Sequence, residues 1–271
     1  NLDFINSLFK DGYYQNGHYK VRSVKVFIDG ALGSRGAALH EPYSDDANNC
    51  GLTLISEDDF KRIAKICHDY KIQLCTHAIG DRGNTKVIDQ YSKFSTKYSR
   101  WRIEHAQMVK YEDILRFKKY HILPSMQPSH CTSDMPWLHD RLGTERLHRI
   151  SRWQSFIDTG CKIPGGSDCP IEEGNPIFEY YAAVTRQSHD GKPKDGWQTQ
   201  EIISRIDALK MFTTWAANGE FAEHRRGKIR PGFDADLSIL SQDITKCKPN
   251  EILTTDILIT MVAGKIIYNN F

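Results

Sequence analysis

The sequence lacks the features that mark membrane, secreted and nucleic-acid-binding proteins. No apolar run approaches the roughly 20 residues that a membrane-spanning helix needs. The seven cysteines are scattered and odd in number, and none forms a Cys-x-x-Cys pair, so a disulfide framework is not expected. A formal net charge of +2 gives no reason to expect a nucleic-acid or membrane surface. We therefore expect a cytoplasmic protein with a small-molecule substrate.

What the chain does contain is an alternation of strands and helices. With 271 residues, 39% of them hydrophobic and 26% charged, it is typical of one large domain, or one plus a small satellite. Short β-rich runs alternate with helical patterns, which predicts a parallel sheet with crossover helices. The predicted strands are 22–28, 72–78, 101–106, 121–128 and 161–165. Five such strands are too few for the eight of a closed (β/α)8 barrel.

Two stretches depart from this alternation. Residues 129–149 contain a tryptophan, three histidines and many charges, and we expect an irregular insertion that could act as a lid. The tail is all-β, with a turn and strand in 227–240 and a hairpin around Ala263-Gly264. We therefore expect a barrel portion over residues 1–222 and a small β portion over residues 223–271.

Three predicted strands end in side chains that bind metals. His77 follows the run 72–76, His105 follows 101–104, and Asp168 follows 161–165. In a β/α barrel the loops after the strands build the active site, and imidazoles with a carboxylate are common metal ligands. For each histidine alone a hydrogen-bonded structural role is the alternative, and Asp168 alone could cap a turn. Their matched positions favour a metal site in which Asp168 also accepts a proton.

Lys25 is a less obvious candidate for the same site. A lysine within an apolar strand has a lowered pKa when buried, and its neutral amine can react with CO2 to give a bridging carbamate. The alternative is an outward-facing strand lysine, and Asp29 is the competing ligand. Glu104 precedes His105 and is expected on the opposite side of its strand, as a structural partner.

Candidate substrate-binding residues lie nearby. Gln127 and His130 follow the predicted strand 121–128 and could hydrogen-bond a substrate carbonyl or shape their loop. Arg82, like Arg35, could bind an acidic group of a substrate, with a surface role as the alternative.

Several stretches together resemble the amidohydrolase superfamily, specifically its YtcJ-like branch (amidohydrolase family 3, also called AepA-like). The resemblance covers nearly the whole chain. The matching stretches are Val24–Arg35, Pro42–Asp45, Gly51–Leu52, His77–Arg82, Arg102–Gln107, Gly166–Pro170, Gly227–Ile229 and Pro231–Leu237.

The resemblance implies a fold and a chemistry. The fold is α/β, a partial (β/α)8 TIM barrel holding strands 4 to 8, with a small β-sandwich portion at the C-terminus. His77 and His105 are then the fifth- and sixth-strand ligands, and Asp168 is the eighth-strand ligand and base. Lys25 falls on the fourth strand, where many members carry a carboxylated lysine. The implied cofactor is one or two divalent ions, zinc by expectation, which activate a water to hydrolyse a C–N, amide-like, non-peptide bond.

The family also uses a His-x-His on its first strand, and this sequence has none. We therefore expect the C-terminal part of a larger enzyme, inactive alone, that self-associates or pairs with the missing N-terminal portion. The alternative is a non-catalytic, regulatory member that serves as a binding scaffold. A barrel enzyme without metal is disfavoured by the paired histidines.

Overall fold

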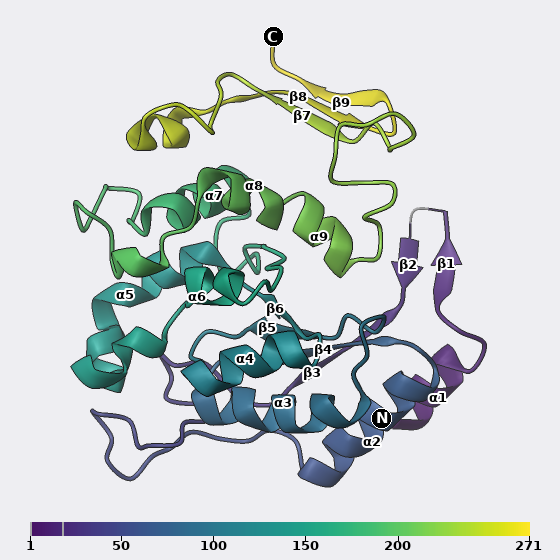
Figure 1. The fold of residues 1–271 in the computed structure, drawn as a ribbon, viewed down its shortest axis with the longest axis vertical. Helices are drawn as coiled ribbons and strands as arrows, with labels where there is room; N and C mark the ends of the chain where they lie inside the picture. Colours follow the sequence, from purple (N-terminus) through teal and green to yellow (C-terminus); the bar gives the residue numbers. More distant parts are fainter. Residues whose placement is uncertain (1, 18) are drawn as a thin grey trace. The chain divides into compact units, whose positions relative to one another are not determined.

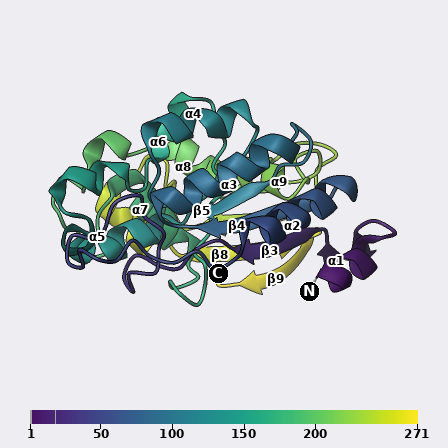
Figure 2. The same cartoon turned by 90° about the horizontal axis from the view of Figure 1, so that it is seen from below.

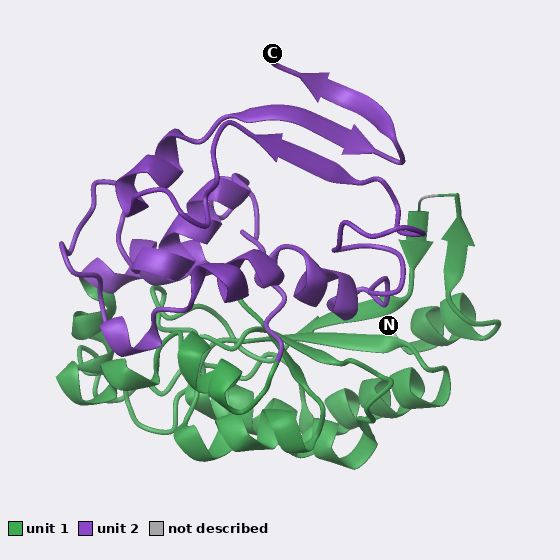
Figure 3. Ribbon diagram, turned by 45° about the horizontal axis from the view of Figure 1, so that its top comes forward, with its two compact units in different colours: residues 1–126, 137–161 green, residues 127–136, 162–271 purple. Residues whose placement is uncertain are grey.

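The computed structural model describes residues 2–17 and 19–271, which form two compact units. Unit 1 contains residues 1–126 and 137–161, and unit 2 contains residues 127–136 and 162–271 (Figure 3). The expected boundary between residues 222 and 223 stays a prediction. The two units are described in turn.

Unit 1 is built on a parallel sheet of four strands in the order β3-β4-β5-β6. The strands are β3 (Ser23–Phe27), β4 (Gln73–Ala78), β5 (Arg102–His105) and β6 (Leu123–Ser125). Between them run the helices α2 (Glu57–Asp69), α3 (Asp81–Phe94) and α4 (Tyr111–Lys119). The predicted α/β class, the parallel pairing and these four strands are confirmed.

The fifth predicted strand is wrong, because no strand is assigned to residues 161–165. Cys161 and Ile163 are buried, so the apolar pattern was real. Pro164 has no N–H to donate and two glycines follow it, which limits the ladder that this segment can form.

The three helices cover one face of the sheet (Figures 1 and 2). Helix α2 begins where the Ser56 side chain accepts the Asp59 amide hydrogen, with acidic residues in its first turn. On the covered face the Thr76 and Tyr91 hydroxyls share a hydrogen bond of 2.8 Å. The alternating strand pattern places Lys25, Phe27 and His77 on the other face.

The remaining elements of unit 1 flank this sheet. They are α1 (Leu2–Phe9), the hairpin strands β1 (Tyr14–Asn16) and β2 (Tyr19–Val21), η1 (Thr144–Arg149) and α6 (Trp153–Asp158). Helix α5 (Pro128–Leu142) belongs to both units. The expectation of an irregular 129–149 insertion is therefore wrong, because most of the stretch is helical despite Pro136.

The long loop after β3 is fastened by arginines. Asp45 accepts hydrogen bonds from Arg35, at 2.9 and 3.0 Å, and also from Arg141. Arg146 is buried and donates to the Ser44 hydroxyl at 3.0 Å and to the Glu41 carbonyl at 3.2 Å. Arginine suits this role because its planar fork donates in several fixed directions. These hydrogen bonds thus hold the loop in a fixed conformation beside the carboxyl end of β3.

Unit 2 combines helices with an antiparallel sheet. Its helical elements are α7 (Pro176–Thr185), η2 (Thr199–Glu201), α8 (Arg205–Met211), α9 (Thr214–Gly219) and η3 (Pro249–Thr254). Its sheet has the order β7 (Leu237–Leu240), β8 (Ile257–Val262) and β9 (Lys265–Asn269). The hairpin at Ala263-Gly264 is confirmed, with both residues at positive φ. No helix among the described residues is long and apolar enough to cross a bilayer.

Candidate metal centre

His77 and His105 meet in unit 1 at the carboxyl ends of neighbouring strands. Their ring centroids lie 4.6 Å apart with an edge-to-face angle of 70°. Both side chains are buried, with residue exposures of 8% and 6%. Because β4 and β5 are adjacent and parallel, they bring residues 28 positions apart in the sequence to the same end of the sheet.

The backbone at His105 is unusual and explains how the two rings meet. The register pairs His105 with Ala78, so regular alternation would place it on the helix-covered face. His105 and Ala106 instead have φ values of 74° and 41°, in the left-handed region. Such residues cost on the order of 1–3 kcal/mol each and cluster at functional sites. This local departure from the strand lets the His105 ring lie against His77.

Lys25 lies on the same face of the sheet as His77. It precedes Phe27 by two residues, and Phe27 is aligned with His77 in the strand register. Its Nζ is 4.8 Å from the centre of the Phe27 ring, and that ring is 4.8 Å from the His77 ring. Phe27 is 51% exposed and Lys25 is also exposed, so the burial from which the sequence argued a carbamate role for Lys25 is not found. The three side chains therefore follow one another across the uncovered face.

Glu104 also faces the His77 side, because the register aligns these two residues. Its carboxylate accepts a hydrogen bond of 2.8 Å from Arg102 Nε. This ion pair agrees with the structural role that the sequence suggested for Glu104. The expectation that Glu104 and His105 lie on opposite sides of the strand is wrong, because the left-handed backbone at His105 brings its ring to the His77 side.

Asp29 is fully buried just beyond β3, and its carboxylate is surrounded by backbone amides. Oδ1 accepts from Ile79 N at 3.0 Å, and Oδ2 accepts from Gly80 N at 2.8 Å and Ala38 N at 2.9 Å. Burial raises the pKa of Asp29 to about 6, while these hydrogen bonds act in the opposite direction. His77 Nε2 is 3.6 Å from Oδ1.

Arg82 contacts the loop after β3. Its guanidinium donates to the carbonyl oxygens of Cys50, at 3.0 Å, and Gly51, at 3.4 Å. These contacts give Arg82 a part in holding the loop, and both its substrate role and the surface alternative stay predictions.

Unit 2 carries Asp168, Gln127 and His130. Asp168 has φ of 57°, a second left-handed residue among the predicted ligands, and its carbonyl accepts from Ile171 N. Burial lowers the pKa of His130, and the carboxylates of Glu172 and Asp168 oppose this shift. Those carboxylates therefore act electrostatically on the imidazole. The grouping of Asp168 and His130 in one site stays a prediction.

Glu179 is a buried acid in the same unit that the sequence gave no reason to notice. It is 1% exposed, and its Oε2 accepts from Ser129 N at 2.9 Å in the first turn of α5. Burial raises the pKa of Glu179 to about 7, and the Ser129 hydrogen bond only partly opposes this. The folded protein thus favours the protonated acid over a pH range where the unfolded chain is ionised.

This shift predicts a pH-dependent stability. Because the folded pKa is raised, the contribution of Glu179 is fully present below its ordinary pKa of 4.5 and is lost as pH rises through 7. Urea unfolding of the full-length protein at pH 4.5 and 7.5 is the measurement. The free energy of unfolding should fall between pH 4.5 and pH 7.5. In Glu179→Gln this fall should be smaller than in the wild-type protein, by roughly 3 kcal/mol at most. The exposed Glu173→Gln is the control, and an unchanged fall in Glu179→Gln would contradict the shift.

The donor set fits part of a metal site. Two imidazoles from adjacent strands are the ligands that zinc-type ions take in proteins. Within the described ranges, no group of three or more His, Cys, Asp or Glu side chains is placed to hold an ion. A metal bound here would take two ligands from His77 and His105 and would need further ligands beside them.

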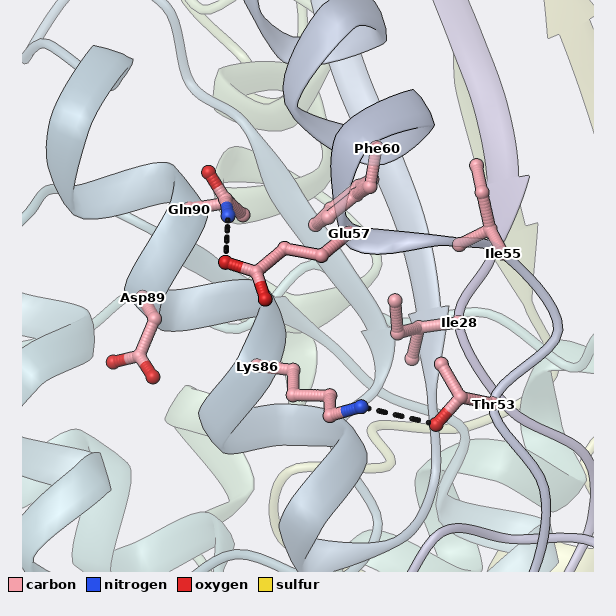
Figure 4. A pocket seen from close by; sticks show the side chains of 8 residues that line it. All are labelled: Ile28, Thr53, Ile55, Glu57, Phe60, Lys86, Asp89 and Gln90. Atoms are coloured by element: carbon pink, nitrogen blue, oxygen red, sulfur yellow. Dashed lines mark hydrogen bonds between the residues drawn. The ribbon is translucent and has the colours of Figure 1, made fainter.

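A separate hollow of about 80 Å³ is lined by neither of these histidines (Figure 4). Four of its polar groups bond in pairs, Lys86 to Thr53 at 3.2 Å and Gln90 to Glu57 at 3.3 Å, and Asp89 accepts a hydrogen bond from Arg116. It contains none of the predicted site residues.

The family model described as "Amidohydrolase family" matches residues 6–268. The chain belongs to the amidohydrolase family. It is 34% identical over 247 residues to "Putative amidohydrolase YtcJ" of Bacillus subtilis, covering 91% of this chain and 47% of that protein. It is also 34% identical over 250 residues to "Protein LONG AFTER FAR-RED 3" of Arabidopsis thaliana, covering 90% of this chain and 42% of that protein.

A solved structure agrees with this assignment. An uncharacterized metal-dependent hydrolase from Pyrococcus horikoshii superposes with a TM-score of 0.81 and 29% identity, covering 92% of this chain and 50% of that one. The chain therefore spans about half the length of the relatives that it matches. The resemblance seen in the sequence is confirmed at the level of the family.

Proposed function

We propose that this amidohydrolase-family chain is the part of a metal-dependent hydrolase that supplies His77, His105 and Asp168 to one metal site. The observation that carries the proposal is the contact between the His77 and His105 rings at the ends of adjacent parallel strands. The left-handed backbone at His105 and Asp168 supports it, because such strain is kept where function requires it.

A divalent cation, zinc by expectation, would supply Lewis-acid activation of a water molecule. The protein residues would then do the rest of the chemistry. Asp168 accepts the proton of the attacking water and returns it to the leaving nitrogen of a C–N, amide-like bond. His130 and Gln127 are proposed to hold the substrate carbonyl. Burial lowers the pKa of His130, which favours the neutral imidazole, and a neutral imidazole has one N–H to donate.

Lys25 is proposed as the carboxylated lysine that completes the ligand set. It lies on the His77 face, and Asp29 has its oxygens occupied by three amides, which favours Lys25 over Asp29 as the ligand. Full-length enzyme depleted of CO2 should lose activity and regain it with bicarbonate, and Lys25→Ala should be partly rescued by small carboxylic acids. Unchanged activity in Lys25→Ala would remove this residue from the site.

A second candidate function is a binding scaffold without catalysis. It is favoured by the 34% identity to a relative whose name states no enzymatic activity. The same fold can serve different functions, so the residues of the site must decide between the two.

The test uses the full-length gene product, purified with its metal. Metal content is measured, and hydrolysis is followed on a panel of N-acyl and formamide compounds. The enzyme proposal expects stoichiometric divalent metal and turnover of at least one C–N substrate. Bound metal without turnover on any member of the panel would favour the scaffold, and absence of metal would contradict both the site and the enzyme.

A further inference from the structure

The carboxylate of Asp29 continues the pairing of β3 and β4 beyond the end of both strands. The last backbone bond between them joins Ile28 N to the His77 carbonyl at 3.0 Å. Beyond this point the chains diverge, and the Asp29 side chain accepts the next two amides of the β4 exit, Ile79 N and Gly80 N. A side chain thereby replaces backbone carbonyls at the turn that follows His77.

The same carboxylate also holds the loop after β3. Its third donor is Ala38 N, 2.9 Å from Oδ2, so the buried carboxylate of Asp29 joins the loop after β3 to the strand that carries His77. A carboxylate that accepts three amide hydrogen bonds has little acceptor capacity left for an ion. Charge-assisted hydrogen bonds of this kind are also stronger than neutral ones.

Glycines make the close approach to Asp29 feasible. A Cβ added at Gly83 would lie 2.5 Å from Asp29 Oδ2 and 2.9 Å from its Cγ. A Cβ added at Gly80 would lie 2.1 Å from the Ala38 carbonyl oxygen. The Gly-Asp-Arg-Gly turn is therefore shaped to fit around the carboxylate.

We propose that Asp29 is a positioning residue for His77, which fixes the β4 exit, and with it the imidazole, in the orientation that faces His105. The 3.6 Å separation of His77 Nε2 and Asp29 Oδ1 adds a direct electrostatic influence on the ring. The role toward a metal rests on the proposed function, whereas the effect on the His77 ring does not.

The variants differ in how they disturb this arrangement. Asp29→Asn keeps the size but sets an NH2 group against backbone N–H donors. Gly83→Ala keeps the carboxylate and displaces it, although alanine normally stabilises a helix by up to about 1 kcal/mol over glycine. Asp113→Asn is the matched control, because Asp113 is also buried in unit 1 but bonds to Thr85 and Arg116.

The experiment uses full-length protein, with ring 15N NMR of His77 in the metal-free state and the affinity for Zn²⁺ measured by competition. Asp29→Asn and Gly83→Ala should both shift the His77 ring signals and weaken Zn²⁺ binding by about 10- to 100-fold, as is typical for residues that orient a ligand. Asp113→Asn should leave both readouts within about twofold. Where Asp29→Asn does not fold, Gly83→Ala gives the same readouts.

Two results would overturn the proposal. If Asp29→Asn lost stability but kept His77 ring signals and a Zn²⁺ affinity like those of Asp113→Asn, the role of Asp29 would be purely structural. If Asp29→Asn lost Zn²⁺ as completely as His77→Ala, while the His77 ring signals of the metal-free protein stayed unchanged, Asp29 would be a metal ligand. Should the wild-type protein bind no Zn²⁺, the proposed function fails, and the ring signals alone decide the role of Asp29.

Discussion

In the full-length protein, His77→Ala and His105→Ala are each expected to lower the affinity for a divalent metal by more than about 100-fold, with turnover falling in parallel. The magnitude should exceed the roughly 10- to 100-fold typical of residues that only orient ligands. The reason is that each of these buried imidazoles, whose rings meet in unit 1, is proposed to supply one metal ligand. Metal content after dialysis against a weak chelator is the measurement.

The exposed His68 on α2 provides the control, since its ring is bonded to the Phe94 carbonyl and its helix covers the opposite face of the sheet. His68→Ala should keep the wild-type metal content. If His77→Ala or His105→Ala also kept it, the imidazole pair would be a structural ring contact.

The second large effect is expected at Asp168. In Asp168→Asn turnover should fall by about 10²- to 10⁴-fold, the range for loss of a general base, while metal content falls less than in either histidine variant. An amide cannot accept the proton, but its oxygen can still act as a ligand. Steady-state rates and metal content of the full-length protein are compared for each variant.

Glu173→Gln is the matched control, because Glu173 is an exposed acid five residues further along. It should leave the rate unchanged. Full turnover in Asp168→Asn would show that another group accepts the proton.

The strands and helices of unit 1 could be predicted because local pattern and tertiary environment agree. The helix from Glu57 has a capping serine, acidic first-turn residues and an apolar face, and all three point to the same boundaries. His77 and His105 could be paired because each lies at the end of a buried strand and parallel strands end at one edge.

Other features depend on contacts that sequence spacing does not encode. The left-handed turn at His105 reverses the side of the sheet that alternation predicts for it. The three amide partners of Asp29 come from residues 38, 79 and 80, so its role appears only once the loop and the strand meet. Glycines at 80 and 83 were the available signal, since two glycines within a helix start suggest close packing.

The helix over Pro128–Leu142 was missed for a related reason. Its weak amphipathic pattern and internal Pro136 resemble a loop in sequence. Its ends are fixed by tertiary bonds instead, from Ser129 N to Glu179 at the start and from Arg141 to the Gly33 carbonyl near the end.

The most direct measurement is a crystal structure of the full-length protein loaded with zinc, with the ion located by anomalous scattering. Zinc is predicted within about 2.0–2.1 Å of one ring nitrogen each of His77 and His105, the ordinary zinc–imidazole bond length. Zinc bound at another site, with these two rings still packed edge to face and uncoordinated, would contradict the account.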